Sequence, residues 1–137
     1  MQDFAWWSGL TVVDARRGAE ISAAPPWRAR ARSTRVAHLL PNYDEYFIGF
    51  KDRSAFGERL RRARADHRVD ALMGHMVFVD GQIVGPWWRT LGKRVDVELR
   101  LLGPLTAPER RLLQRAAERY GTFLGLPVHL VFTPYDR

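Results

Sequence analysis

The stretch from residue 75 to residue 101 constrains the fold more than any other part of the chain. Two segments rich in β-branched residues flank Asp80-Gly81, a pair that favours a type I′ turn, so a β-hairpin is expected here. Residues 94–101 then alternate strictly between charged and apolar side chains, which is typical of an antiparallel strand with one buried face. The stretch therefore predicts three or four sequential strands in an antiparallel, β-barrel-like meander.

The rest of the chain mixes strands with helices. Thr106 and Glu109 stand at the spacing of a capping box with a proline between them, so a C-terminal helix is expected to begin there and to end at Gly125. The other expected elements are strands over residues 34–40, 45–50 and 128–132 and a basic helix over residues 54–66. The predicted fold class is therefore α+β.

The N-terminal residues predict two short helices joined by a tight turn. Residues 3–9 carry an aromatic face, a glycine suits the turn, and Thr11 favours the start of a second helix over residues 12–21. Helix, glycine turn and helix in this order are typical of a helix-turn-helix motif. We expect residues 1–26 to form a partial winged-helix segment of this kind and residues 27–137 to form a β-barrel-like α+β domain.

The chain is strongly basic. Its 137 residues carry a net charge of +7, and the isoelectric point is about 10.7. A basic surface attracts polyanions such as nucleic acid, and arginine makes forked contacts to phosphates and to guanine edges. Of the 22 cationic residues only Lys51 and Lys93 are lysines, a bias that GC-rich coding also produces. Both interpretations of the charge remain open.

Composition excludes several classes of protein. Because there is no cysteine, disulfides, thiolate zinc ligands and a thiol nucleophile are excluded. No apolar run is long enough to span a bilayer and no signal-peptide pattern begins the chain, so a cytoplasmic protein without membrane contact is expected. The four histidines lie in separate expected elements, and no glycine-rich phosphate loop occurs. We expect neither a metal site nor a cofactor.

Two aromatic stretches are candidates for ligand contact. Tyr43 and Tyr46 precede Lys51-Asp52-Arg53, and this stretch forms either a phosphate-facing rim or a strand with core aromatics and an internal Asp–Arg ion pair. In Trp87-Trp88, alternation along a strand sends one indole to the core and the other outward. The outward indole beside Arg89 either suits base stacking or covers the end of a barrel.

Three motifs together resemble one family. They are, in chain order, F-A-W-W-S-G-L-T-x-x-D-A-R-R, L-L-P-N-Y-D-E-Y-x-I-G-F-K-D-R-S and V-D-G-Q-I-V-G-x-W-x-R-T. The combination resembles the bacterial winged-helix DNA-binding-domain proteins that include the AlkZ-like and YcaQ-like DNA glycosylases. Members of that family carry tandem winged-helix modules followed by a barrel-like domain, and this chain resembles only their C-terminal third. The resemblance implies a nucleoid-associated DNA-repair protein whose partner is double-stranded DNA.

The resemblance also marks what this sequence lacks. Glycosylases of the family carry an upstream Gln-x-Gln or Gln-x-Asp motif, and no such pair is present, so the enzymatic activity is not carried over. Asp44 and Asp52 remain as acids to test. The resemblance further implies that the first motif corresponds to the second and third helices of the last winged helix, without its first helix. We therefore expect apolar surface around Phe4, Trp6, Val12 and Val13 to be covered by the barrel, by a second copy of the chain or by a separately encoded partner.

Three functions follow from these observations. The first is a DNA-binding module that contacts mainly phosphates, and the second is a part or paralogue of a DNA glycosylase acting on alkylated or crosslinked bases. The third is a small-molecule or protein-interaction module, in which Tyr43, Tyr46 and Trp87 line a pocket. The expected DNA contacts are Arg16, Arg17, Arg28, Arg30, Arg32, Lys51, Arg53 and Arg89.

Overall fold

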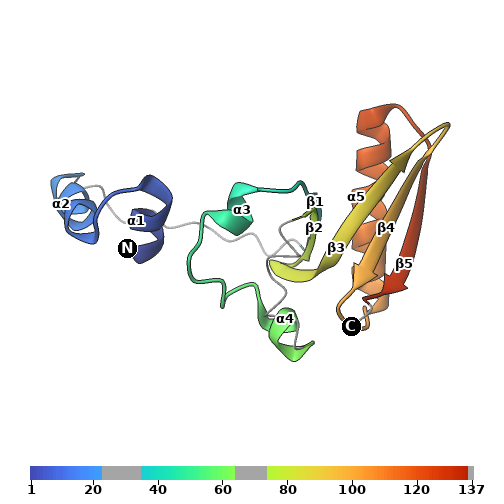
Figure 1. Ribbon diagram of the computed structural model, residues 1–137. Coiled ribbons are helices and arrows are strands. Elements are labelled where there is room, and N and C mark those ends of the chain that lie inside the picture. The colour runs from blue at the N-terminus through green and yellow to red at the C-terminus, as the bar shows by residue number, and fades with distance from the viewer. Residues whose placement is uncertain (23–34, 64–73, 136–137) are drawn as a thin grey trace. The chain divides into compact units, whose positions relative to one another are not determined.

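The computed structural model describes residues 1–22, 35–63 and 74–135. Helices and one five-stranded sheet occur together, so the expected α+β class is confirmed (Figure 1). The chain divides into two units: Met1–Thr34 with Asp44–Arg53, and Arg35–Tyr43 with Ser54–Arg137. The elements, in chain order, are α1 (Gln2–Ser8), α2 (Val12–Ser22), β1 (Ala37–Leu40), α3 (Glu45–Ile48), α4 (Glu58–Arg62), β2 (Met76–Val79), β3 (Gln82–Leu91), β4 (Val95–Leu101), α5 (Ala107–Leu124) and β5 (Val128–Pro134).

The first unit begins with the two short helices that the sequence predicts. α1 ends at Gly9, whose φ of 72° is a left-handed conformation that glycine adopts freely. Thr11 then starts α2, because its hydroxyl accepts a hydrogen bond from the backbone N–H of Asp14 at 3.1 Å. Ala15 is the buried residue of α2, so this helix packs through a small side chain and leaves most of its surface exposed.

The strand expected over residues 45–50 is wrong, because these residues begin the short helix α3 instead. Asp44 caps the helix: its carboxylate accepts a hydrogen bond from the N–H of Tyr46 at 2.9 Å. Trp7 of α1 adds a contact from a distant part of the chain, since its indole N–H donates to the carboxylate of Glu45 at 3.2 Å. A short alternating run is compatible with either structure, and here the cap and the distant indole favour the helix.

The second unit is built on a sheet with the strand order β1-β2-β3-β4-β5. β1 to β4 pair antiparallel in sequence, which confirms the predicted meander. The hairpin between β2 and β3 has positive φ at both Asp80 (49°) and Gly81 (77°), as a type I′ turn requires. β5 pairs parallel with β4 after the crossover through α5. Among the described strands the sheet is open, with β1 and β5 at its two edges.

β3 changes its pairing partner along its length. Its first half pairs with β2, and its second half, from Trp87 onward, pairs with β4. The change follows Gly85, where a Cβ atom would lie 1.8 Å from the carbonyl oxygen of Arg100. The φ of Gly85, 153°, also favours glycine. The register shift between Val77 and Phe78 marks the same irregularity on β2. Glycine is therefore required where the two pairings meet.

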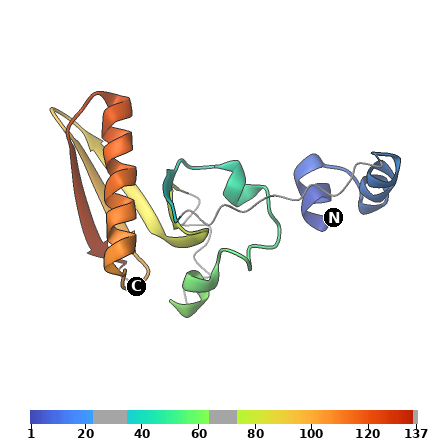
Figure 2. The same cartoon turned by 180° about the vertical axis from the view of Figure 1, so that it is seen from behind.

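α5 covers one face of this sheet and supplies the larger core (Figure 2). Val97 and Leu99 of β4 and Leu113 of α5 are fully buried there. The predicted capping box is present at Thr106, and the helix ends at Gly125 with a φ of 66°. The helix thus begins and ends where the sequence predicts, with its apolar stripe on the sheet.

A second, smaller core lies at β2 and β3 on the opposite face. Phe78 points away from the neighbours that contact α5, and it packs edge-on against Phe56 with ring centroids 5.9 Å apart. Leu60 of α4 is also buried. The helix expected over residues 54–66 is present as Glu58–Arg62, and residues 64–66 lie outside the described residues. Trp88, farther along β3, stays exposed on this face.

Gly85→Ala is expected to destabilise the second unit strongly. The added methyl group collides with the carbonyl of Arg100, so we expect the free energy of unfolding to fall by about 2–4 kcal/mol. Gly103→Ala is the control, because a Cβ atom at that position meets open space. Thermal melts followed by circular dichroism compare the variants. Equal melting temperatures for the two would contradict the role assigned to Gly85.

Candidate nucleic-acid interface

Charge is distributed unequally between the two units. In the first unit the described carboxylates outnumber the cationic side chains; in the second unit the opposite holds. The first unit carries Arg16, Arg17, Lys51 and Arg53 against Asp3, Asp14, Glu20, Asp44, Glu45 and Asp52. The second unit carries Arg35, Arg59, Arg61, Arg62, Arg89, Lys93, Arg94, Arg100, Arg110, Arg111, Arg115 and Arg119 against Glu58, Asp80, Asp96, Glu98, Glu109 and Glu118. The described excess of positive charge therefore belongs to the second unit.

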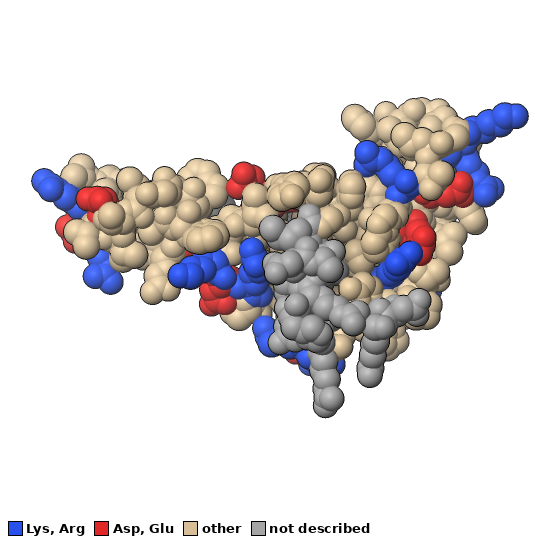
Figure 3. All heavy atoms as spheres, viewed as in Figure 1, with Lys and Arg blue, Asp and Glu red and all other residues tan. Residues whose placement is uncertain are grey.

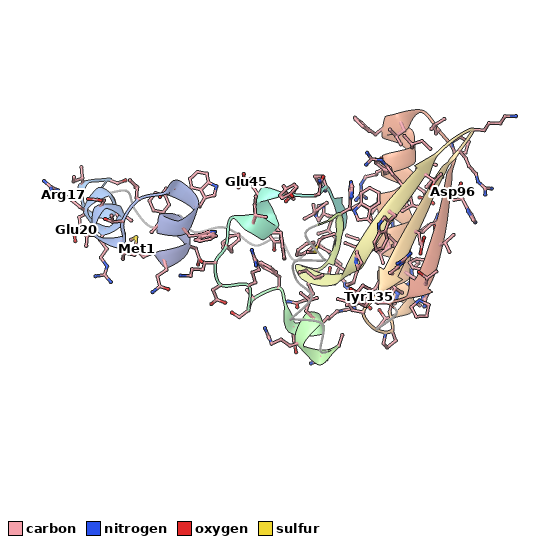
Figure 4. All side chains as sticks on the ribbon, viewed as in Figure 1. Met1, Arg17, Glu20, Glu45, Asp96 and Tyr135 are labelled. Carbon is pink, nitrogen blue, oxygen red and sulfur yellow. The ribbon has the colours of Figure 1, made fainter. Side chains whose placement is uncertain are left out.

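α2 presents the first two arginines that the sequence predicts as DNA contacts. Arg16 and Arg17 are exposed, and neither forms an ion pair with a residue in the described part of the chain. Figure 4 shows Arg17 and Glu20 on this helix. Both guanidinium groups are thus available to an anionic partner. Arg28, Arg30 and Arg32 lie outside the described residues.

The segment after α3 contains the next two predicted contacts. Its backbone is held by Asp3, whose carboxylate accepts hydrogen bonds from the N–H groups of Lys51 and Asp52 at 3.1 and 3.2 Å. Lys51 is exposed, whereas Arg53 is half-buried. The guanidinium of Arg53 lies 4.6 Å from the ring centroid of Phe47. Lys51 is therefore the freer cation, and Arg53 contributes to packing within the unit.

The aromatic candidates differ in exposure. Tyr43 and Tyr46 are exposed, on the second and first unit respectively. Trp87 is only 3% exposed: its indole N–H donates to the carbonyl of Leu40 at 2.8 Å, and its ring packs against Tyr120 of α5. The alternation prediction is confirmed, with Trp87 inward and Trp88 outward. Trp88 is therefore the indole of this pair that a ligand can reach.

Trp88 stacks with an arginine on the exposed face of the sheet. The guanidinium carbon of Arg100 lies 4.4 Å from the ring centroid of Trp88, and its Nε donates to Glu98 at 2.9 Å. Arg89, the predicted contact on β3, lies with its guanidinium carbon 5.9 Å from the ring of Tyr120. Because Tyr120 belongs to α5, Arg89 lies on the helix side of the sheet and Arg100 on the open side.

Two carboxylates of β4 share the open face with Trp88. The hydrogen bond to His129, at 2.8 Å, lowers the pKa of Asp96, and the hydrogen bond from Arg100 lowers the pKa of Glu98. Both carboxylates are therefore ionised at neutral pH. Figure 3 shows cationic and acidic side chains lying beside each other on the sheet, and Figure 4 labels Asp96 on β4.

α5 carries two exposed arginines that the sequence did not single out as DNA contacts. Arg111 and Arg115 are one helical turn apart, and neither pairs with a described carboxylate. Arg110 stacks over the ring of Phe132 at 5.0 Å, and Arg119 donates to a backbone carbonyl of β1. The signal was present in the sequence as two cationic residues four positions apart on the solvated side of the helix.

Of the two acids kept as catalytic candidates, Asp44 caps α3 through its carboxylate. The other, Asp52, is exposed, and its backbone N–H donates to Asp3. Across residues 1–22, 35–63 and 74–135, no three histidine, aspartate or glutamate side chains gather as ligands for a metal ion.

Glu109 is the buried carboxylate of the described residues and borders a cavity of about 460 Å³. It accepts hydrogen bonds from the backbone N–H and the hydroxyl of Thr106, at 2.7 and 2.9 Å, and forms an ion pair with Arg59 of α4. Burial raises the pKa of Glu109, but these hydrogen bonds and the charge of Arg59 together lower it further than burial raises it. Glu109 therefore acts as a fixed acceptor that joins α4 to α5.

The sequence matches the family model of AlkZ-like DNA glycosylases over residues 1–123, and the chain therefore belongs to the AlkZ-like DNA glycosylase family. This confirms the resemblance carried by the three motifs. No curated protein matches the chain. It is similar to one solved structure, the Streptomyces sahachiroi DNA glycosylase AlkZ, at 21% sequence identity and a TM-score of 0.44. That similarity covers 85% of this chain and 29% of the other. None of the described helices is long and apolar enough to cross a membrane.

Glu109→Gln is expected to destabilise the fold at neutral pH and to weaken its response to acid. The pKa of Glu109 is lower in the folded state, so its charge stabilises the fold above the unfolded-state pKa of about 4.3. This contribution is lost as the pH falls through the folded-state pKa. We expect a loss of about 1–2 kcal/mol at pH 7 that shrinks at pH 3.

Urea unfolding at both pH values measures this effect. Glu58→Gln is the matched control, because its ion pair with Arg62 is exposed and is expected to contribute well under 1 kcal/mol. A Glu109→Gln deficit of the same size at pH 3 and pH 7 would show that charge is not the cause.

Proposed function

We propose that this chain binds double-stranded DNA mainly through phosphate contacts and with little sequence preference. The observation that carries the proposal is the excess of exposed arginine on a member of a DNA glycosylase family. Phosphate contacts need cationic side chains without a carboxylate partner, and counterion release makes such binding sensitive to salt. Arg16 and Arg17 on α2 and Arg111 and Arg115 on α5 meet that requirement among the described residues.

Within this proposal the contacts have unequal weight. Lys51 and Arg89 are exposed and extend the set, whereas Arg53 is partly engaged with Phe47. The predicted basic arm of Arg28, Arg30 and Arg32 belongs to the same proposal. We also propose that residues 1–26 form a partial winged helix and that residues 27–137 form a barrel-like domain. In this function the protein acts in the cytoplasm, in association with the nucleoid.

The proposal assigns binding rather than base excision to this chain. Excision needs a group that positions water or stabilises a sugar cation, and Asp44 is already occupied as a helix cap. The alternative is a part or paralogue of a DNA glycosylase acting on alkylated or crosslinked bases, with which the family membership is equally compatible. Release of free base from alkylated duplex DNA by this chain, lost in Asp44→Asn or Asp52→Asn, would favour that alternative. The third proposed function is a small-molecule or protein-interaction module.

The apolar surface of the first unit favours a protein partner as well. A groove of about 450 Å³ lies between α1 and α2, and its lining is mainly apolar, with Met1, Phe4, Leu10 and Ala15 beside the polar Asp14 and Ser22. The side chains of Val13 and Ile21 on α2 are 73% and 75% exposed. So much exposed apolar surface on a small unit is typical of an interaction site. We include in the proposal a homodimer or a separately encoded partner that covers this surface.

DNA binding is tested by fluorescence anisotropy of a labelled duplex at two salt concentrations. With roughly 4–6 phosphate contacts, log K is expected to fall with log salt at a slope of about −4 to −5. The double variants Arg16→Ala/Arg17→Ala and Arg111→Ala/Arg115→Ala are each expected to weaken binding about tenfold for every duplex sequence and to reduce the slope by about 2.

Arg62→Ala is the matched control, because Arg62 is exposed but paired with Glu58. A double variant that binds as well as the native chain removes that helix from the interface. Absence of duplex binding by the native chain at low salt contradicts the proposed function as a whole.

Self-association is tested by light scattering over a range of protein concentrations. If a second copy covers the first unit, the apparent mass rises above 15.8 kDa with concentration. Val13→Ser/Ile21→Ser then restores the monomer, because it removes exposed apolar side chains from α2. Phe123→Ser is the control, since Phe123 is 84% exposed on α5 in the other unit. A strictly monomeric native chain at high concentration contradicts the homodimer.

A further inference from the structure

The open face of β3, β4 and β5 carries an aromatic platform that duplex binding does not use. α5 covers the opposite face, and Figures 1 and 2 show the sheet from its open and its covered side. On the open side Trp88 is 43% exposed and stacks with the guanidinium of Arg100 at 4.4 Å. Nε of Arg100 donates to Glu98, which holds the guanidinium over the indole ring. The stacked pair presents a flat surface in a fixed orientation.

Beside this platform, two carboxylates each keep one oxygen without a described partner. Oδ1 of Asp96 contacts both Nε of Arg94 and Nδ1 of His129. Oε1 of Glu98 likewise accepts from both Nε of Arg100 and the hydroxyl of Thr133. Oδ2 of Asp96 and Oε2 of Glu98 have no hydrogen bond to any residue that the structure describes. Because the other oxygens fix both carboxylates in orientation, two acceptors are positioned for a ligand.

A cavity of about 330 Å³ borders Trp88 and both carboxylates. Its lining includes Trp88, Thr90, Asp96, Glu98, Val131 and Thr133. A ligand that suits it has a flat ring to stack on the platform and N–H donors for the carboxylates. A nucleobase has both properties.

We propose that this open sheet face binds an unpaired base of single-stranded DNA. The base stacks on Arg100 and Trp88, and its donor edge faces Glu98 and Asp96. Every base has a face that can stack on an aromatic ring, but in a duplex that face is covered by neighbouring bases. The site therefore selects unstacked nucleotides and leaves duplex phosphates to the cationic residues of the proposed function.

The carboxylates also predict which base is preferred. Cytosine presents an amino group, which donates to aspartate and glutamate, whereas thymine presents a carbonyl oxygen at the equivalent position. A carbonyl oxygen close to Oε2 of Glu98 is repelled. Oligo-dC is therefore expected to bind more tightly than oligo-dT, although oligo-dT stacks on the same platform. A cationic peptide, the other ligand that carboxylates attract, is disfavoured because Arg94 and Arg100 flank the same acids.

The test is fluorescence anisotropy of labelled ten-nucleotide oligo-dC and oligo-dT with the full 137-residue chain, beside a labelled duplex. Trp88→Ala is expected to weaken both single strands roughly tenfold and to leave the duplex unchanged. Trp88→Tyr keeps an aromatic ring and is expected to restore most of the affinity. Glu98→Gln is expected to weaken oligo-dC more than oligo-dT. Phe123→Ala is the control, because it removes an exposed ring from α5 instead.

Each outcome bears on the proposal. Loss of single-strand binding in Trp88→Ala with intact duplex binding, and recovery in Trp88→Tyr, supports it. Equal losses on single strand and duplex, or no loss, overturn it, as does a native chain that binds no single strand. Duplex binding that fails while oligo-dC still binds contradicts the proposed function alone, so the two failures are distinguishable. Circular dichroism melts check that the variants are folded.

Discussion

The close approach of β3 and β4 at Gly85 is the constraint on which the second unit depends. A side chain at this position would collide with the carbonyl of Arg100, so only glycine lets β3 leave β2 and continue as the partner of β4. Trp87 and Trp88 follow directly after the change of partner. Trp87 is fixed against α5 by its hydrogen bond to Leu40, and alternation then turns Trp88 to the open face. One backbone contact thus sets which indole packs and which faces solvent.

Coverage of the sheet by other elements decides where a ligand has access. α5 buries one face along β3, β4 and β5, and the ion pair between Arg59 and Glu109 links α4 to its N-terminal turn. On the other face, Phe56 and Leu60 are buried near β2 and β3, and Trp88 stays exposed. The exposed part of that face is stabilised by pairs across the strands rather than by burial. Such pairs hold polar groups in fixed orientations at little cost in desolvation.

The sequence was a good guide where local signals agreed with each other. The Asp80-Gly81 turn, the alternation of residues 95–101 and the capping box at Thr106 each combine a backbone preference with a matching apolar pattern, and all three are confirmed. The strand predicted over residues 45–50 is wrong because a six-residue alternation is weak evidence. The helix found there is capped by Asp44 and contacted by an indole from α1, and no local pattern reveals the contact from α1.

The candidate site was less predictable from sequence than the fold was. Whether an arginine is free to bind an anion depends on which carboxylate or ring the fold brings beside it, and this is a property of distant residues. Arg53 and Arg110 each stack on an aromatic ring, whereas Arg111, next to Arg110 in sequence, has no described partner. The net charge calculated from the sequence does not distinguish paired arginines from free ones. For the same reason Trp88 was identified by alternation, but the Arg100 stack that turns it into a platform required the pairing of β3 with β4.

These contacts suggest different ligands for the two faces of the second unit. Arg111 and Arg115 lie on the solvated side of α5, where no described neighbouring group fixes their orientation. Such side chains can contact the phosphate backbone of any DNA sequence. The open side of the sheet offers the reverse: its arginines are paired, its net charge is small, and its groups are held in fixed geometry. Fixed donors, acceptors and rings discriminate among bases, whereas unpaired charges do not. A chain that carries both surfaces can hold DNA by its backbone on one side and recognise an unstacked base on the other.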